Sequence, residues 1–123
     1  MATVDLELKR QFQELGMKVV ETQAKMKQID AAVDALTRSS QRCNLTLTEV
    51  KSLAPNVTTY QSVGRMFVKA QHETITKDLE TAIKLSTERV QELEKNKSIL
   101  EKSLKDKENS LREIIAQRQQ KSD

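Results

Sequence analysis

The most informative stretch of the chain is CNLTLTEVKSLAPNVTTYQSVGRMFVK, residues 43–69. It contains the only proline of the 123-residue chain, one of the two glycines and two of the three aromatic residues. Up to residue 68 it has only three charged side chains: Glu49, Lys51 and Arg65. The segments on both sides are rich in charge and nearly free of Gly and Pro. The chain therefore divides into three pieces.

The second half of this stretch predicts a β-hairpin, because β-branched and aromatic residues are concentrated in 57–61 and 66–68. The first half has capping-box spacing in residues 46–49, which predicts a short helical turn that Pro55 ends. A two-stranded hairpin is only marginally stable in water on its own. We therefore expect its strands to pair with strands of other chains. The alternative is a hairpin folded onto the helix ends.

The two flanking segments carry heptad seams, in which seam residues recur at alternating intervals of four and three. In the first segment eight of nine seam positions are apolar: Leu8, Phe12, Leu15, Val19, Thr22, Met26, Ile29, Val33 and Leu36. In the third segment eight of eleven are apolar: Leu79, Ile83, Ser86, Val90, Leu93, Lys97, Leu100, Leu104, Lys107, Leu111 and Ile114. Polar seam residues can fix the register and the choice of partner. We expect helices over 4–42 and 70–119, with a short turn and the hairpin over 43–69.

Neither helix can bury its seam alone, and the middle piece is long enough to reverse the direction of the chain. The simplest arrangement is antiparallel, with Leu36 near Leu79 and Leu8 near Lys107, so that the chain ends meet at the far tip. The predicted fold class is mainly α: one domain over 1–123, a long antiparallel two-helix coiled coil with a central β-hairpin. Gly16 lies off the seam and is either a tolerated weak point or a close contact.

The far tip is a second candidate site. In the expected register, Leu111 and Ile114 extend beyond the level of Leu8, and two helices can shield such side chains only partly. Exposed apolar groups beside Lys and Glu suit transient binding of hydrophobic segments of other proteins. The alternative is fraying ends with scattered exposed apolar residues. The candidate residues are Val4, Leu6, Leu8, Leu111, Ile114 and Ile115.

Composition excludes several classes of protein. Only 2% of the residues are aromatic and 32% are charged, which argues against sandwiches, barrels and disulfide scaffolds. The net charge of +3 is spread evenly, so no basic block exists for nucleic acid to follow. No stretch approaches the roughly 18 apolar residues that span a bilayer, and no secretory signal is evident. We expect a soluble cytoplasmic protein that binds neither nucleic acid nor membrane.

Catalysis finds little support in the sequence. The only histidine, His72, falls on the extrapolated heptad, which favours a structural role near the start of the second helix. The only cysteine, Cys43, lies at the end of the first expected helix and has no histidine next to it in the sequence. We therefore interpret it as a small apolar residue and not as a nucleophile. The two are too few for a zinc site, and no glycine-rich phosphate loop is present. We predict no catalytic residue, no metal site and no cofactor.

The middle of the chain resembles a β-type prefoldin subunit. The resemblance lies in Leu45-Thr46 and Glu49 ahead of the run Tyr60-Gln61-Ser62-Val63-Gly64-Arg65-Met66-Phe67, and it extends to the order helix, β-rich insert and returning helix. It implies a heterohexamer of two α-type and four β-type subunits, in which hairpins join an intersubunit β-barrel. This chain would then have two α-type and three further β-type partners. The residues that would carry assembly are Tyr60, Val63, Gly64, Met66, Phe67 and Val68.

The resemblance also implies a function. Family members act without ATP, hold unfolded proteins such as actin and tubulin at the coiled-coil tips, and pass them to the cytosolic chaperonin. The tip residues named above would contact these clients. The strongest competing interpretation is a structural or tethering coiled coil, which would form parallel dimers on its own. A small nucleic-acid-binding helical hairpin is third and an enzyme is last.

Overall fold

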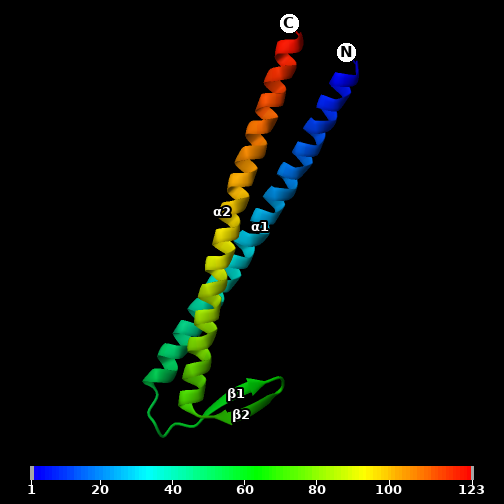
Figure 1. Cartoon of the computed structure of the whole chain (residues 1–123). Helices are drawn as coiled ribbons and strands as arrows, with labels where there is room; N and C mark the ends of the chain where they lie inside the picture. Colours follow the sequence, from blue (N-terminus) through cyan, green and yellow to red (C-terminus); the bar gives the residue numbers. More distant parts are fainter. Residues whose placement is uncertain (1, 123) are drawn as a thin grey trace. The chain divides into compact units, whose positions relative to one another are not determined.

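A computed structural model describes the backbone of residues 2–122 and the side chains of residues 6–120. The chain folds as α1 (Ala2–Ser52), β1 (Thr59–Val63), β2 (Met66–Ala70) and α2 (His72–Ser122) (Figure 1). This architecture confirms the predicted fold class of two long helices around a β-hairpin. The contacts divide the chain into two compact units. The terminal unit comprises Met1–Ala31 and Leu93–Asp123, and the hairpin unit comprises Ala32–Glu92.

Helix α1 ends at Ser52, so the predicted end at residue 42 and the separate helical turn are wrong. The heptad spacing in fact continues past Leu36 at intervals of four and three, and each of these further seam residues is half-buried: Ser40, Cys43, Leu47 and Val50. The Thr46 hydroxyl does not cap a new helix but donates to the Arg42 carbonyl oxygen at 3.0 Å, one turn back in the same helix. Pro55 then prevents the helix from continuing.

Helix α2 begins at His72 and ends at Ser122, whereas the sequence predicted 70–119. The start is later because Ala70 pairs with Thr59 as the last residue of β2. The Ile75 N–H donates to the Gln71 carbonyl oxygen at 3.1 Å, which places Gln71 at the helix boundary. The chain thus leaves the sheet and enters α2 within two residues.

The hairpin forms where it was expected, but its strands are shifted. Strand β1 begins two residues later than the predicted 57–61, and β2 extends two residues beyond the predicted 66–68. Val57 stays outside the sheet because its N–H donates to the Ala54 carbonyl oxygen at 3.1 Å, in a turn that follows the end of α1. The shifted strands match in length and pair antiparallel.

Gly64 makes the tight turn of the hairpin possible. Val63 pairs with Met66, so only Gly64 and Arg65 connect the strands. Gly64 has a φ of +62°, and among the described residues no side-chain-bearing residue has a positive φ. A two-residue loop with a left-handed glycine followed by a residue of negative φ matches a type II′ turn, whose twist suits the flanking strands.

In the hairpin unit, α1 and α2 run antiparallel in a register that differs from the expected one. Leu36 lies in a shallow groove with Val90 and Gln91 instead of near Leu79. The predicted register was wrong because α1 is longer than predicted, which places the reversal of the chain later. Close to that reversal, Lys51 Nζ lies 3.5 Å from Glu80 Oε1. The most buried apolar side chain of this unit is Ile75, which is 9% exposed.

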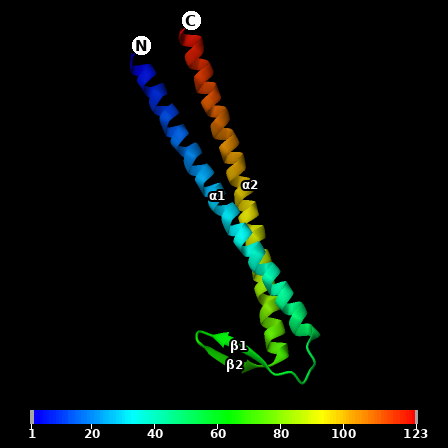
Figure 2. The same cartoon turned by 180° about the vertical axis from the view of Figure 1, so that it is seen from behind.

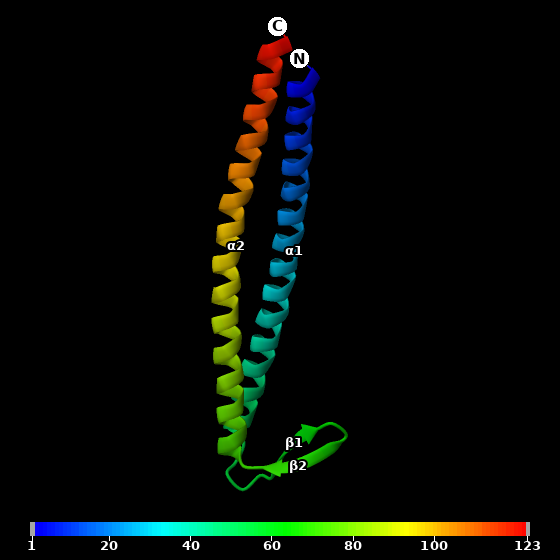
Figure 3. The same ribbon diagram turned by 45° about the vertical axis from the view of Figure 1, so that its right-hand side comes forward.

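The hairpin projects sideways from the first turn of α2 and does not lie back along the helix (Figures 2 and 3). One side-chain hydrogen bond connects its first strand to the body of α2, from Gln61 Nε2 to Asp78 Oδ2 at 3.2 Å. The sheet consists of β1 and β2 alone within the described part of the chain. The hairpin is therefore attached at its base and open along most of its length.

In the terminal unit, the beginning of α1 and the end of α2 lie at the same end, as the antiparallel prediction requires (Figure 1). Lys107 was expected near Leu8, but its Nζ donates to Thr22 Oγ1 at 3.3 Å, and this too corrects the register. Thr22 is the most buried polar residue described, at 4% exposed, and Leu93 is 8% exposed. No described side chain is fully buried, so the seam is a thin core.

Two polar seam positions of α2 are matched across the helix pair by acceptors on α1. Lys107 binds Thr22, and Lys97 Nζ lies 2.7 Å from Asp30 Oδ1. The hydrogen bond to Asp30 and the charge of its carboxylate raise the pKa of Lys97 above its ordinary value of 10.5. Each pair forms in only one register, so the two together oppose sliding of one helix along the other.

The first prediction concerns the Asp30–Lys97 pair. Because the pKa of Lys97 is raised in the folded state, its contribution is complete below pH 10.5 and is lost as the pH rises through the folded-state value. We expect Lys97→Gln to lower the melting temperature at pH 8, and the difference from the wild type to shrink at a pH well above 10.5. Circular dichroism melts at the two pH values measure this.

Lys95→Gln is the matched control, since Lys95 is exposed on the same helix and forms no ion pair with a described residue. A Lys97→Gln deficit no larger than that of Lys95→Gln at pH 8, or one that persists unchanged at high pH, would contradict the role of the pair.

The second prediction concerns the two glycines. A Cβ added to Gly16 would meet nothing within 4 Å, so Gly16 is a tolerated weak point and not a close contact. We expect Gly16→Ala to stabilise the fold by about 0.5–1 kcal/mol through helix propensity. Gly64→Ala should destabilise it by about 1 kcal/mol, because φ of +62° strains any side-chain-bearing residue. Chemical denaturation measures both, and equal effects of the two substitutions would refute the assignment.

Candidate functional site

The β-hairpin offers unsatisfied backbone groups along both edges. Its two strands pair from Thr59↔Ala70 to Val63↔Met66, and each strand has no neighbour on its other side among the described residues. Every second N–H and C=O of each strand therefore points outward. Such edges are templates for strands from another chain.

Both faces of the hairpin are apolar near its turn. Because side chains alternate along a strand and paired residues share a face, Tyr60 and Phe67 lie on the same face of the hairpin. The Tyr60 side chain is 60% exposed and the Phe67 side chain 74%. The opposite face presents Val63, Met66 and Val68, which are 52%, 65% and 49% exposed. The predicted assembly residues are thus brought together, and their apolar side chains lie in solvent. An exposed apolar cluster of this kind marks an interaction surface.

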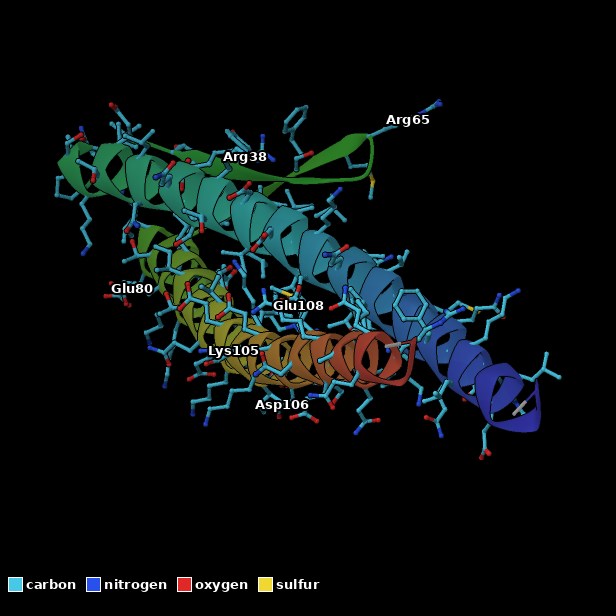
Figure 4. All side chains as sticks on the ribbon, turned by 90° about the horizontal axis from the view of Figure 1, so that it is seen from above. Arg38, Arg65, Glu80, Lys105, Asp106 and Glu108 are labelled. Atoms are coloured by element: carbon cyan, nitrogen blue, oxygen red, sulfur yellow. The ribbon has the colours of Figure 1, made fainter. Side chains whose placement is uncertain are left out.

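The base of the hairpin is held by His72. Its Nε2 donates to the Val57 carbonyl oxygen at 2.7 Å, since a carbonyl can only accept. This bond ties the loop after α1 to the first residue of α2, which gives His72 the structural role that the sequence predicted. At the other end of the hairpin, Arg65 points away from the helices (Figure 4). The charged guanidinium thus projects beyond the apolar faces.

The second candidate site is a groove of about 410 Å³ near the chain ends of the terminal unit. It will be called the tip groove. Its walls are Leu8 and Phe12 of α1 and four residues of α2: Ile114, Ile115, Arg118 and Gln119. Phe12 and Ile115 are 42% and 43% exposed. The groove is therefore a partly apolar surface that solvent can reach.

Three of the predicted tip residues line this groove, Leu8, Ile114 and Ile115. Leu111 is half-buried elsewhere on the seam, and Leu6 is 66% exposed outside the groove. The side chain of Val4 lies outside the described residues. Leu8 and Gln119 share the groove, so Leu111 and Ile114 do not extend beyond the level of Leu8 as expected.

Sequence reasoning missed Phe12 and Arg118 as groove residues. Phe12 was assigned only to the seam, and Arg118 received no role. The heptad spacing of α2 would have placed Arg118 on the seam, four residues after Ile114. What the spacing could not show was which α1 residues stand opposite, because that depends on the register.

Potential metal-binding and reactive side chains are scattered over the described residues. Residues 6–120 contain no cluster of three His, Cys, Asp or Glu side chains that could hold a metal ion. Cys43 is half-buried on the seam inside α1, and not at the helix end as expected. Within the described part, neither helix has an apolar stretch of the length that a membrane crossing requires. Outward-facing charges such as Lys105 and Asp106 cover the side of α2 away from α1 (Figure 4).

Comparison with known proteins agrees with this architecture. A family model described as "Prefoldin subunit" matches residues 13–118. "Prefoldin subunit 1" from Mus musculus is 41% identical over 117 residues, which cover 95% of this chain and 96% of the relative. The protein of that name from Arabidopsis thaliana is 32% identical over 106 residues, with coverage of 86% and 83%.

The fold is also that of a solved relative. The crystal structure of the prefoldin beta subunit from Thermococcus strain KS-1 matches with a TM-score of 0.76 and 19% identity, over 84% of this chain and 90% of that one. The family model and the sequence identities, extending over nearly the whole chain, establish what the hairpin and the paired helices suggested: the chain belongs to the prefoldin subunit family.

Proposed function

We propose that this chain is a β-type subunit of a heterohexameric prefoldin, an ATP-independent co-chaperone of the cytoplasm. Its partners would be two α-type and three further β-type subunits. The observation that carries the proposal is the open hairpin, which has unpaired edges and exposed apolar side chains on both faces. A surface of this kind is satisfied by strands from sister subunits, as in a barrel that several chains close together.

The energetics favour assembly through the hairpin. Fully burying a Val, Phe or Met side chain contributes about 1.5–3 kcal/mol. The hairpin exposes five large apolar side chains, so their burial outweighs the contribution of any single hydrogen bond. The exposed edges add directional backbone bonds that set how neighbouring strands align. The apolar residues drive the association, and the edges fix its geometry.

We further propose that the tip groove binds unfolded client proteins, including actin and tubulin, and passes them to the cytosolic chaperonin. The groove is shallow and partly polar, which suits weak contacts with short dissociation times. Several such tips in one hexamer would raise the effective concentration, so that together they hold a client that one tip releases. Weak single contacts also permit transfer.

The alternative of a tethering coiled coil is less well supported. A tether would keep its seam available for a partner and would run parallel to it. Here α1 and α2 of the same chain cover each other's seams antiparallel within each unit. The hairpin and the tip groove stay open to solvent beside the paired seams, and they are the two surfaces that a co-chaperone subunit needs.

The third prediction tests assembly. Phe67→Asp places a charge on the most exposed large apolar side chain of the hairpin and should abolish incorporation into the hexamer, because the charge would be buried there. Far-UV circular dichroism should show unchanged helices. Size-exclusion chromatography and native mass spectrometry of the chain co-expressed with its partner subunits measure incorporation.

Met17→Asp is the matched control. Met17 is 73% exposed, against 74% for Phe67, but lies on α1 in the terminal unit. It should enter the hexamer normally. A full-sized hexamer containing the Phe67→Asp chain would reject assembly through the hairpin.

The fourth prediction tests client binding. We expect the double variant Phe12→Gln/Ile115→Gln to assemble normally but to suppress aggregation of a denatured client several-fold less well. Both side chains are already about two-fifths exposed, so the substitutions should leave the helices formed. Light scattering of diluted, denatured actin measures protection by hexamers that contain the variant.

The control Met17→Gln/Val20→Gln removes two apolar side chains that are more exposed, at 73% and 65%, but lie outside the groove. If the two double variants lose protection equally, general surface hydrophobicity and not the groove would hold the client.

A further inference from the structure

Three cationic residues lie on the seam of α2 within the terminal unit: Lys97, Lys107 and Arg118. Two of them are matched across the helix pair, Lys97 by the Asp30 carboxylate at 2.7 Å and Lys107 by the Thr22 hydroxyl at 3.3 Å. Arg118 forms no ion pair or hydrogen bond with any described side chain. The third seam cation thus differs from the other two in lacking an acceptor among the described side chains of α1.

The residues around Arg118 explain this difference. At its level α1 supplies Leu8 and Phe12, which are apolar and accept no hydrogen bond. Glu14, two residues after Phe12, already accepts from Arg10 Nε at 3.2 Å. Glu7 occupies an outward heptad position and forms no ion pair among the described residues. The guanidinium therefore lines an apolar groove without a counter-charge among the residues described.

We propose that the tip groove selects client segments in which an Asp or Glu side chain lies next to bulky apolar side chains. The apolar side chains would pack against Phe12 and Ile115, and the carboxylate would pair with the Arg118 guanidinium. This inference rests on the proposed client binding and specifies the chemistry of the segment that binds.

The physical argument is charge complementarity in a partly dry site. A guanidinium presents donors in a planar fork that a carboxylate can accept from both oxygens. Apolar side chains packed beside the pair exclude some water and strengthen the attraction. A segment with Lys in the same place meets repulsion from Arg118, so the preference combines attraction for one class with rejection of the other.

The test uses the full-length chain and two fluorescent peptides. Both are acetylated and amidated, and they share one apolar core that is followed by Glu in the first and by Lys in the second, so that only a side-chain carboxylate is compared. Fluorescence anisotropy should show the Glu peptide binding about two- to fivefold more tightly at low salt, the size typical of an exposed ion pair. The preference should shrink in 0.5 M salt.

Arg118→Gln should bind both peptides equally, with an affinity between those of the wild type for the Glu peptide and for the Lys peptide. Arg112→Gln is the matched control: it removes the same charge from an exposed residue of α2 outside the groove and should keep the preference. Circular dichroism should show unchanged helix content in both variants.

Each outcome is decisive. If the wild type binds both peptides equally, or if Arg118→Gln keeps the preference, the charge selection is overturned while client binding stands. If the wild type binds neither peptide and also fails to protect denatured actin, the proposed client binding fails as well, and the inference with it.

Discussion

The half-buried seam between α1 and α2 is the constraint on which the other features depend. No described side chain is fully buried, and the most buried seam residues are Leu93 and the polar Thr22. A core this thin gains little from any one residue, so its stability is the sum of many partial contacts. The register then has to be set by directional pairs, and Asp30–Lys97 and Thr22–Lys107 supply them in the terminal unit.

Closing the seam within one chain determines which apolar residues remain available. The hairpin cannot fold back onto helices whose seams already cover each other, and its own two strands are too few to bury a face. The exposure of its apolar side chains, 74% for Phe67, is therefore a consequence of the helix pairing. The proposed assembly surface and the helix pair are two results of one distribution of apolar residues.

The two helices could be predicted from the sequence, but the register in which they pair could not. Heptad spacing identified both helices because period 3.5 is a strong, local signal. The end of α1 was predicted ten residues too early, at 42 instead of Ser52, because polar Ser40 and the capping-box spacing at Thr46 hid a seam that continues through Leu47. The misplaced turn then shifted every expected contact, so that Leu8 was paired with Lys107. Phe12 and Arg118 were missed for the same reason, since a groove exists only once the opposing residues are known.

The tip groove follows from the way the seam ends. At Leu8 and Phe12, α1 still presents apolar seam residues, but beyond Ile115 the groove residues that α2 offers in return are Arg118 and Gln119. The apolar seam is thus incomplete at this end, and the α1 side chains there remain only partly covered by apolar contacts. A hydrophobic segment of another protein would fill the place of the missing seam residues. Because it would replace only one or two layers of a thin core, its hold would be weak, and weak binding at each tip is what the proposed delivery of a client requires.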